Sequence, residues 1–375
     1  MSIIRIIGFL LLATLTSVSA AQDTTPIINA DNIDQLASVL TINFADAPEE
    51  AGIIQNGWFV LNENGTHAAT INRANALVIW DTVSGDYVDS YALTSADGLP
   101  ATVLDMAFGN VTSQGESHEL FVSLHSDGQT YSLGYFDIAS GEFESVVVSE
   151  SQTAIPVRVW IGDLLTYVEI QTTTPEQQSY ILGRPTIVPN RGMLGNEAIS
   201  RTSPDNDPDA FVRIGRVLPP FAVTSTVDGL VKLWNLETGQ VTATAQVDDG
   251  PPVFGQVNAS GSHLVWRDPE STALHVLDFE MGEDAIVAQL GGEYFPALLL
   301  TDAADVVIAV NSINAQSEIA PIVIAWDVAT GERRVLGEHR SCNRQPDMAR
   351  LSHNGTTLVI GCDTGLDIWR VSVEE

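Results

Sequence analysis

The sequence contains very little positive charge. Only one of its 375 residues is lysine, Lys232, and lysine and arginine together number 16 against 48 aspartate and glutamate residues, so the net charge is −32. A field of this sign repels phosphate backbones and anionic lipid headgroups, which argues against nucleic acid as a partner. The sequence also lacks G-x-S-x-G, H-E-x-x-H and phosphate-binding glycine-rich patterns. It therefore predicts neither a nucleophilic serine nor a zinc site.

Long apolar runs are also missing, apart from one at the N-terminus. Arg5 precedes the apolar residues 6–15, and Val18-Ser19-Ala20 follows with the small residues of a cleavage site. This arrangement predicts a cleavable signal peptide over residues 1–20, with an uncleaved anchor as the alternative. We expect export to the periplasm, cell surface or medium, with no membrane insertion after cleavage. Residues 21–34 are interpreted as a linker and residues 35–375 as a single domain.

A repeated hairpin dominates the remaining sequence. Alternating apolar residues lead to an aromatic or apolar residue and a polar one, a glycine turn follows, and a second alternating run completes the unit, as in ALVIWDTVSGDYV (76–88). Such alternation is typical of half-buried strands joined by a tight turn. The polar position recurs at intervals of 43 to 56 residues, with one gap of 98, at Asp81, Asp137, Asn235, Asp278, Asp327 and Arg370. The long gap predicts an eroded unit between residues 157 and 190, and seven units in all.

Two segments resemble the WD-repeat (WD40-like) family of β-propellers, in an exported bacterial form. They are VTSTVDGLVKLWNLETGQ (223–240) and LSHNGTTLVIGCDTGLDIWRV (351–371). The resemblance implies an all-β, seven-bladed propeller of four-stranded antiparallel blades, in which an N-terminal strand (35–43) completes the last blade. It also implies that the hydrogen-bond network of the family occurs at most in the last blade, through His339, Asp363 and Trp369.

The same blade geometry implies that the loop before a blade and the loop joining its second and third strands share one face. Cys342 and Cys362 would meet there in the last blade, and an oxidising compartment permits a disulfide between them. Two buried or weakly paired thiols are the alternative. The longer connections are expected on this face as well, at residues 171–178, 188–209, 312–320 and 337–347.

Five arginines lie in or beside the last of these connections. They are Arg333, Arg334, Arg340, Arg344 and Arg350. Guanidinium groups grip carboxylates and sulfates through paired hydrogen bonds, so these residues are partner-binding candidates. The alternative is local pairing with acids such as Glu332, Glu338 and Asp347.

The predicted function is a non-catalytic, monomeric scaffold that binds a protein or glycan and carries no cofactor. Asp205, Asp207 and Asp209 are weak calcium candidates, because this segment lacks the glycine and glutamate of a calcium loop, and a polar loop is the default interpretation. The alternative function is a propeller enzyme with a site in the central channel, either a lactonase-like hydrolase or a quinoprotein. AWDVATGERRV (325–335) resembles the quinoprotein repeat but lacks its closing tryptophan.

Overall fold

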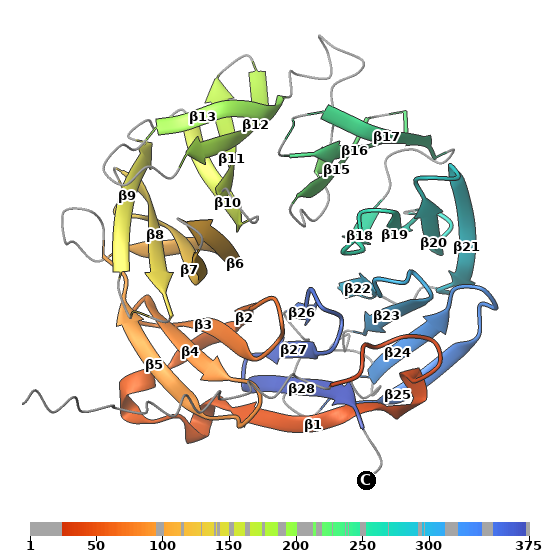
Figure 1. Ribbon diagram of the computed structural model, residues 1–375, viewed down its shortest axis with the longest axis horizontal. Coiled ribbons are helices and arrows are strands. Elements are labelled where there is room, and N and C mark those ends of the chain that lie inside the picture. The colour runs from red at the N-terminus through yellow and green to blue at the C-terminus, as the bar shows by residue number, and fades with distance from the viewer. Residues whose placement is uncertain are drawn as a thin grey trace, which may run out of the picture.

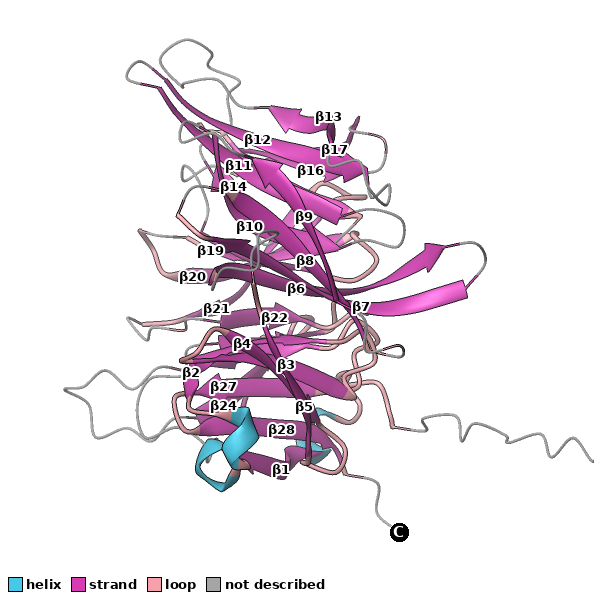
Figure 2. Ribbon diagram, turned by 90° about the vertical axis from the view of Figure 1, so that its left-hand side faces the viewer, coloured by secondary structure: helices cyan, strands magenta, loops and turns pink. Residues whose placement is uncertain are grey.

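The protein is described from a computed structural model. The described residues are 25–94, 101–113, 116–128, 130–138, 140, 143–149, 154–161, 166–174, 177–186, 193–200, 213–214, 220–226, 228–236, 238, 240–247, 253–268, 270–291, 295, 297–311, 322–339 and 348–372. Within them the only helices are three short 3-10 turns, η1 (Ile33–Gln35), η2 (Phe44–Asp46) and η3 (Glu49–Ala51), which flank the first strand (Figure 2). In this part of the chain no helix has the length and apolar composition needed to cross a bilayer.

The strands form seven four-stranded antiparallel sheets arranged as a ring (Figure 1). We number these blades from 1 to 7 in chain order. Blade 1 is β2 (Ile54–Leu61), β3 (His67–Asn72), β4 (Ala76–Asp81) and β5 (Tyr87–Ala92). Blade 2 is β6 (Thr102–Ser113), β7 (Glu116–Ser126), β8 (Tyr131–Asp137) and β9 (Phe143–Ser149). Blade 3 is β10 (Ala154–Ile161), β11 (Thr166–Thr174), β12 (Gln177–Thr186) and β13 (Met193–Ser200).

The other four blades follow the same order from the centre of the ring outward. Blade 4 is β14 (Arg213–Ile214), β15 (Phe221–Ser225), β16 (Leu230–Asn235) and β17 (Gln240–Gln246). Blade 5 is β18 (Val253–Val257), β19 (His263–Arg267), β20 (Ala273–Asp278) and β21 (Glu283–Gln289). Blade 6 is β22 (Ala297–Leu300), β23 (Val306–Val310), β24 (Ile322–Asp327) and β25 (Arg333–Glu338). Blade 7 is β26 (Met348–Leu351), β27 (Leu358–Cys362), β28 (Gly365–Val371) and β1 (Leu36–Asn43).

An eroded unit was expected between residues 157 and 190, and the structure corrects its position. Six sheets have four strands of four residues or more, whereas in blade 4 the innermost strand, β14, is reduced to Arg213–Ile214. The eroded unit expected between residues 157 and 190 is instead part of the fully four-stranded blade 3. The eroded blade is therefore blade 4, one blade later than the spacing of the hairpins indicates. Blade 3, which extends from β10 to β13, accounts for the interval of 98 residues between Asp137 and Asn235.

The outermost strand of blade 7 comes from the opposite end of the chain. β1 pairs with β28 from Leu36 opposite Val371 to Asn43 opposite Gly365, with an irregularity between Ser38 and Leu40. Within β1, Leu36 and Ile42 are buried while most other side chains are partly or fully exposed. This alternation buries one face of the strand against its neighbours and leaves the other at the rim of the ring.

Buried apolar side chains fill the spaces between neighbouring blades. Each cluster in the described residues draws on adjacent blades: one joins blades 5 and 6 through Val265, Leu274 and Trp326, and another joins blades 7 and 1 through Ile368, Phe59 and Trp80. Close packing requires small residues at some contacts. A Cβ on Gly261, which has a φ of +74°, would lie 2.6 Å from the ring of Phe221 in blade 4. The ring is therefore held by interfaces between blades.

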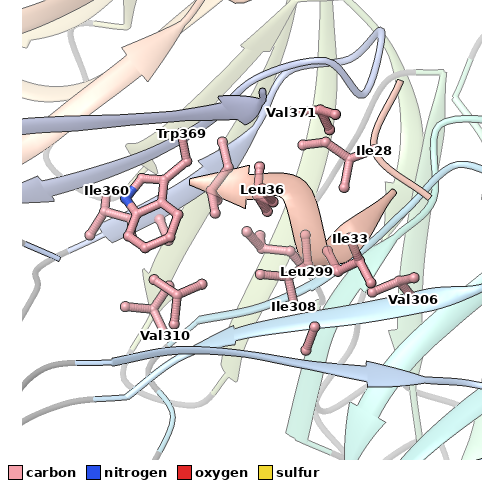
Figure 3. Close-up of a cluster of buried hydrophobic side chains, with 14 of the residues drawn as sticks. Ile28, Ile33, Leu36, Leu299, Val306, Ile308, Val310, Ile360, Trp369 and Val371 are labelled. Atoms are coloured by element: carbon pink, nitrogen blue, oxygen red, sulfur yellow. The ribbon is translucent and has the colours of Figure 1, made fainter. Parts of the chain in front are cut away.

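Residues 25–35, most of them in the segment interpreted as a linker, belong to this packing. Ile28 and Ile33 are buried with Leu36, Leu299 and Val306 in the cluster between blades 6 and 7 (Figure 3). The backbone N–H of Ile28 bonds to the Gly355 carbonyl at 2.9 Å, and that of Ala30 bonds to the Asp305 carboxylate at 2.8 Å. The N-terminal segment thus crosses from blade 7 to blade 6 before it reaches β1.

Candidate functional site

The polar residue of the hairpin repeat caps the turn between the third and outermost strands. Asp81 Oδ1 accepts bonds from the backbone N–H groups of Val83 and Ser84, at 2.7 and 3.0 Å. Asp278 Oδ1 does the same for Glu280 and Met281. Side chains at the same position of blades 2, 4 and 6 also cap their turns, those of Asp137, Asn235 and Asp327. The hydrogen bonds from these turn amides hold the pKa of the Asp278 and Asp327 carboxyls below its usual range.

Tryptophans of the third strand repeat a second contact. Trp80 Nε1 donates to Thr70 Oγ1 at 2.9 Å in blade 1, and Trp234 Nε1 donates to Thr224 Oγ1 at 2.8 Å in blade 4. The acceptor lies on the neighbouring strand, opposite the residue two before the tryptophan. Blades 1 and 4 thus share this threonine–tryptophan bond.

Blade 7 uses a carboxylate in place of that threonine. Trp369 Nε1 donates to Asp367 Oδ2 at 3.2 Å, and Asp367 Oδ1 accepts from the hydroxyls of Ser38 at 2.6 Å and Thr41 at 3.0 Å. Asp367 is completely buried, whereas Asp363, the acid assigned to the network from the sequence, is exposed in the turn between β27 and β28. Asp367 therefore joins the core tryptophan of the last blade to its outermost strand.

His339, the histidine assigned to the same network, follows β25 directly and is 2% exposed. Among the residues that the structure describes, neither ring nitrogen has a partner in hydrogen-bonding geometry. Burial lowers the pKa of His339 to about 4, against the opposing influence of the Asp367 carboxylate and of the Asn311 backbone. The imidazole is therefore neutral at physiological pH.

Arg370 stands where the other blades have a turn-capping acid or amide. Its guanidinium donates to Thr357 Oγ1 at 3.1 Å, and it reaches blade 1 through the Gly65 carbonyl and Thr82 Oγ1, both at 3.3 Å. No turn follows β28 because the outermost strand arrives from the N-terminus. The side chain links blades 7 and 1 instead.

The arginine run of the sequence does not form one cluster. Arg333 and Arg334 lie on β25, the outermost strand of blade 6, and Arg334 binds Asp34 at 2.9 Å and Glu332 at 3.3 Å. Arg350 lies on β26, the innermost strand of blade 7. The two strands thus lie at the outer edge of one blade and at the inner edge of the next. For Arg334 the local pairing proposed as the alternative is what the structure shows.

Charged side chains of the innermost strands bind the backbone of the next blade. Arg350 is half-buried, and its Nε donates to the Phe59 carbonyl of blade 1 at 3.0 Å. Asp105 of blade 2 accepts the Val159 N–H of blade 3 at 2.8 Å. Burial lowers the pKa of Arg350, and the Asp105 carboxylate opposes this shift. These charges therefore join neighbouring blades near the centre of the ring.

Three further side chains come together in blade 5 without a counterpart in the sequence prediction. His275 stacks on Trp266, with ring centroids 4.0 Å apart, and Asp284 meets both rings: Oδ1 accepts Trp266 Nε1 at 3.0 Å and Oδ2 lies 2.8 Å from His275 Nδ1. Here the tryptophan lies on the second strand instead of the third. The register of β19 and β20 puts Trp266 opposite His275, and the sequence alone does not show this pairing.

Several predicted site residues lie outside the described part of the chain. They are Arg340, Arg344, Cys342, Asp205, Asp207 and Asp209. Cys362 is fully buried at the end of β27 and carries no free thiol. Its pairing with Cys342 and the calcium site stay predictions.

The connections between strands differ sharply in length between the two ends of the sheets. At the end that carries the links between blades and between second and third strands, the five longest connections are residues 44–53, 93–101, 201–212, 311–321 and 339–347. At the other end every connection has six residues or fewer. Two expected connections are corrected: residues 171–178 are mostly strand in β11 and β12, and residues 188–209 include β13.

Comparisons with known proteins identify the fold and nothing finer. No protein family matches the chain, and no curated protein sequence matches it. A chain in the crystal structure of a mitotic checkpoint complex is similar over 99% of both chains, with a TM-score of 0.55 and 10% identity. In all, 1210 chains of solved structures match, so the likeness is to a widely shared architecture. The chain has a WD40-like β-propeller fold.

Proposed function

We propose that this protein is an exported, non-catalytic scaffold that binds a protein or glycan through the propeller face with the long connections. The observation that carries the proposal is the difference in connection length between the two ends of the sheets. Short turns suffice to build a propeller, so long connections at one end only point to a use beyond folding. A rigid ring presents such segments in fixed positions, which reduces the entropy lost on binding.

The residues in these connections suit recognition of an acidic group. Residues 339–347 contain Arg340 and Arg344, in a chain whose net charge of −32 would otherwise repel acidic partners. Arginine binds carboxylates and sulfates through two parallel hydrogen bonds. A Cys342–Cys362 disulfide would tie this connection to the end of β27 and support an ordered binding segment.

Export is the second part of the proposal and rests on residues 1–20. The mass of the protein, isolated from the cells that produce it, tests export directly. We expect a mature chain that starts after Ala20 and a non-reducing peptide map that joins Cys342 to Cys362. An intact N-terminus with both cysteines as thiols would contradict export through signal cleavage.

The binding face is tested by capture of partners with the mature chain, residues 21–375, as bait. The bait with Arg340→Ala and Arg344→Ala is compared with a control bait carrying Arg333→Ala, which alters the outer strand β25. We expect a partner that the control retains and the double variant loses by more than tenfold. Retention by the double variant, with loss on Glu63→Lys at the opposite face, would overturn the choice of face.

A further inference from the structure

Two turns at the end of the sheets with the short connections contain the same tripeptide, Asn-Gly-Thr. Residues 64–66 lie between β2 and β3 in blade 1, and residues 354–356 lie between β26 and β27 in blade 7. A glycine after an asparagine lets its backbone nitrogen approach the side-chain amide closely, because no Cβ obstructs it. The third Asn-Gly pair of the chain, residues 56–57, lies within β2. The two turns therefore carry the same reactive pair in different surroundings.

Both turns hold the side-chain carbonyl of the asparagine in the same way. Asn64 Oδ1 accepts hydrogen bonds from the backbone N–H of Thr66 at 3.2 Å and from its hydroxyl at 2.7 Å. Asn354 Oδ1 accepts the same two bonds from Thr356, at 3.2 and 2.9 Å. Such donors stabilise the negative charge that a nucleophile places on a carbonyl oxygen. In both turns the glycine N–H bonds to the carbonyl three residues earlier, at 3.1 Å in blade 1 and 2.9 Å in blade 7, so this bond must open before attack.

The turn of blade 7 fixes its asparagine more firmly. Asn354 is half-buried, its Oδ1 accepts a third bond from Ser352 Oγ at 2.8 Å, and its backbone N–H donates to the Glu63 carbonyl at 3.2 Å. Its Nδ2 donates to the Asn64 carbonyl at 3.5 Å. Asn64 is exposed, and among the residues that the structure describes its Nδ2 has no hydrogen-bond partner. The amide nitrogen of Asn64 can therefore leave without the loss of a contact with the protein.

We propose that Asn64 is a site of spontaneous deamidation, which converts it to aspartate and isoaspartate in the folded protein. The Gly65 nitrogen forms a bond to Asn64 Cγ and loses its proton, while the bond from Cγ to Nδ2 breaks and the amide nitrogen leaves as ammonia. Water then opens the cyclic imide at one of its two carbonyls. Opening at Cγ gives aspartate, and opening at the main-chain carbonyl gives isoaspartate. Water is the only reagent.

The position of the turn makes this modification act on the closure of the ring. Gly65 has a φ of +72°, and a Cβ there would lie 2.7 Å from Thr357 of blade 7, so the turn requires its glycine. The Gly65 carbonyl accepts bonds from Thr82 Oγ1 and, at 3.3 Å, from Arg370 of blade 7. Isoaspartate adds a methylene to the main chain directly before this glycine. Its formation therefore displaces a contact between blades 1 and 7, at the end of the sheets opposite the proposed binding face.

Incubation of the full chain at pH 8 and 37 °C, followed by peptide mass spectrometry that separates asparagine, aspartate and isoaspartate, tests this inference. The products at residues 64 and 354 are measured in the native protein and in protein unfolded in guanidinium chloride. Because the two tripeptides are identical, the unfolded chain gives their intrinsic rates, which should be similar. A difference in the native protein then comes from the structure alone.

In the native protein we expect residue 64 to react about tenfold faster than residue 354, because reaction at Asn354 breaks further hydrogen bonds. Similar native rates at the two residues would overturn the site. So would the absence of product at residue 64 under conditions in which the unfolded chain reacts. This result needs no variant, so it does not depend on how a substitution affects folding.

The effect on closure is tested by denaturant unfolding of fresh and aged protein. We expect aged wild type to unfold at a lower denaturant concentration than fresh wild type. Asn64→Gln, whose longer side chain cyclises far more slowly, should keep its midpoint on ageing, and the matched control Asn354→Gln should lose stability as the wild type does. An unchanged midpoint in wild type with residue 64 converted would contradict an effect on the junction of blades 1 and 7.

Discussion

Trp80 of blade 1 and Trp369 of blade 7 occupy equivalent positions on the third strand but bind different partners. The residue two before each tryptophan faces Thr70 in blade 1 and Ile360 in blade 7. Because isoleucine cannot accept a hydrogen bond, Trp369 uses Asp367 on its own strand. The carboxylate has acceptor capacity left over, and the two hydroxyls of β1 use it. The acceptor of the tryptophan lies on the second strand in blade 1 and on the third strand in blade 7. In blade 7 it therefore bonds the closing strand β1 as well as the tryptophan.

The next position shows the same specialisation. Blades 1, 2, 4, 5 and 6 have an aspartate or asparagine that caps the following turn, whereas blade 7 has Arg370, which binds blade 1. A blade whose outermost strand comes from the other chain end has no turn to cap. Blade 7 therefore differs from the other blades at Asp367 and Arg370, the two positions that bond the closing strand β1 and blade 1.

Replacement of Asp367 by alanine should have the largest effect. It leaves the buried indole N–H and two hydroxyls without an acceptor, so we expect the free energy of unfolding to fall by about 3–5 kcal/mol in urea denaturation. Thr70→Val removes one acceptor from Trp80 and should cost about 1–2 kcal/mol. Exposed Asp363→Ala is the control, with an expected change within about 0.5 kcal/mol. Equal losses for Asp367→Ala and Thr70→Val would remove the distinction between the blades.

Arg370→Met tests the link from blade 7 to blade 1. The variant keeps the apolar stem but loses the bonds to Thr357, Thr82 and the Gly65 carbonyl. Because all three acceptors belong to buried residues, we expect a loss of about 2 kcal/mol in urea denaturation. Arg73→Met, on the loop between β3 and β4, is the matched control. A loss as small as that of the control would show that Arg370 does not stabilise the junction.

A designed exchange sharpens the comparison. Asp367→Val with Ile360→Thr gives blade 7 the arrangement of blade 1 and should restore the bond to Trp369. We expect the double variant to recover about 1 kcal/mol relative to Asp367→Val alone. Hydrogen exchange of β1 should stay fast, because Ser38 and Thr41 still lack their acceptor. Full recovery of β1 protection would show that the hydroxyl contacts contribute nothing to closure.

Asp327→Ala should have the smallest effect, about 0.5–1 kcal/mol, because its bonds lie in an exposed turn. The lowered pKa of Asp327 means that its contribution is present above the unfolded value of 3.8 and is lost as the pH falls through the folded one. The stability difference between variant and wild type should therefore be constant from pH 5 to 8 and shrink below about pH 3.8. A difference that grew in acid would contradict the capping role.

The sequence predicts the repeat better than its exceptions. Period-2 alternation and a polar residue before each glycine turn led to the four-stranded antiparallel blades of a propeller, which the structure confirms. The resemblance to the WD-repeat family assigned the network in blade 7 to Asp363, which lies between β27 and β28. Only the register, which puts Ile360 opposite Asp367, shows that the acceptor has moved.

The arginines illustrate a different limit. Arg334 and Arg350 are close in sequence, yet β25 is the outermost strand of one blade and β26 the innermost of the next. Between blades the chain passes from the outermost strand of one sheet to the innermost strand of the next, so residues close in sequence are separated by the width of a sheet. Proximity along the chain therefore does not predict a shared surface at such a crossing.

A double-mutant cycle between β1 and blade 7 tests most directly whether Asp367 holds the closing strand. Ser38→Ala, Asp367→Ala and the double variant are compared with the wild type by urea denaturation. A hydrogen bond to a buried carboxylate predicts a coupling free energy of about 1.5–3 kcal/mol between the two positions. Additive losses, with a coupling below about 0.3 kcal/mol, would contradict the account, since β1 would then be held by its backbone pairing and apolar side chains alone.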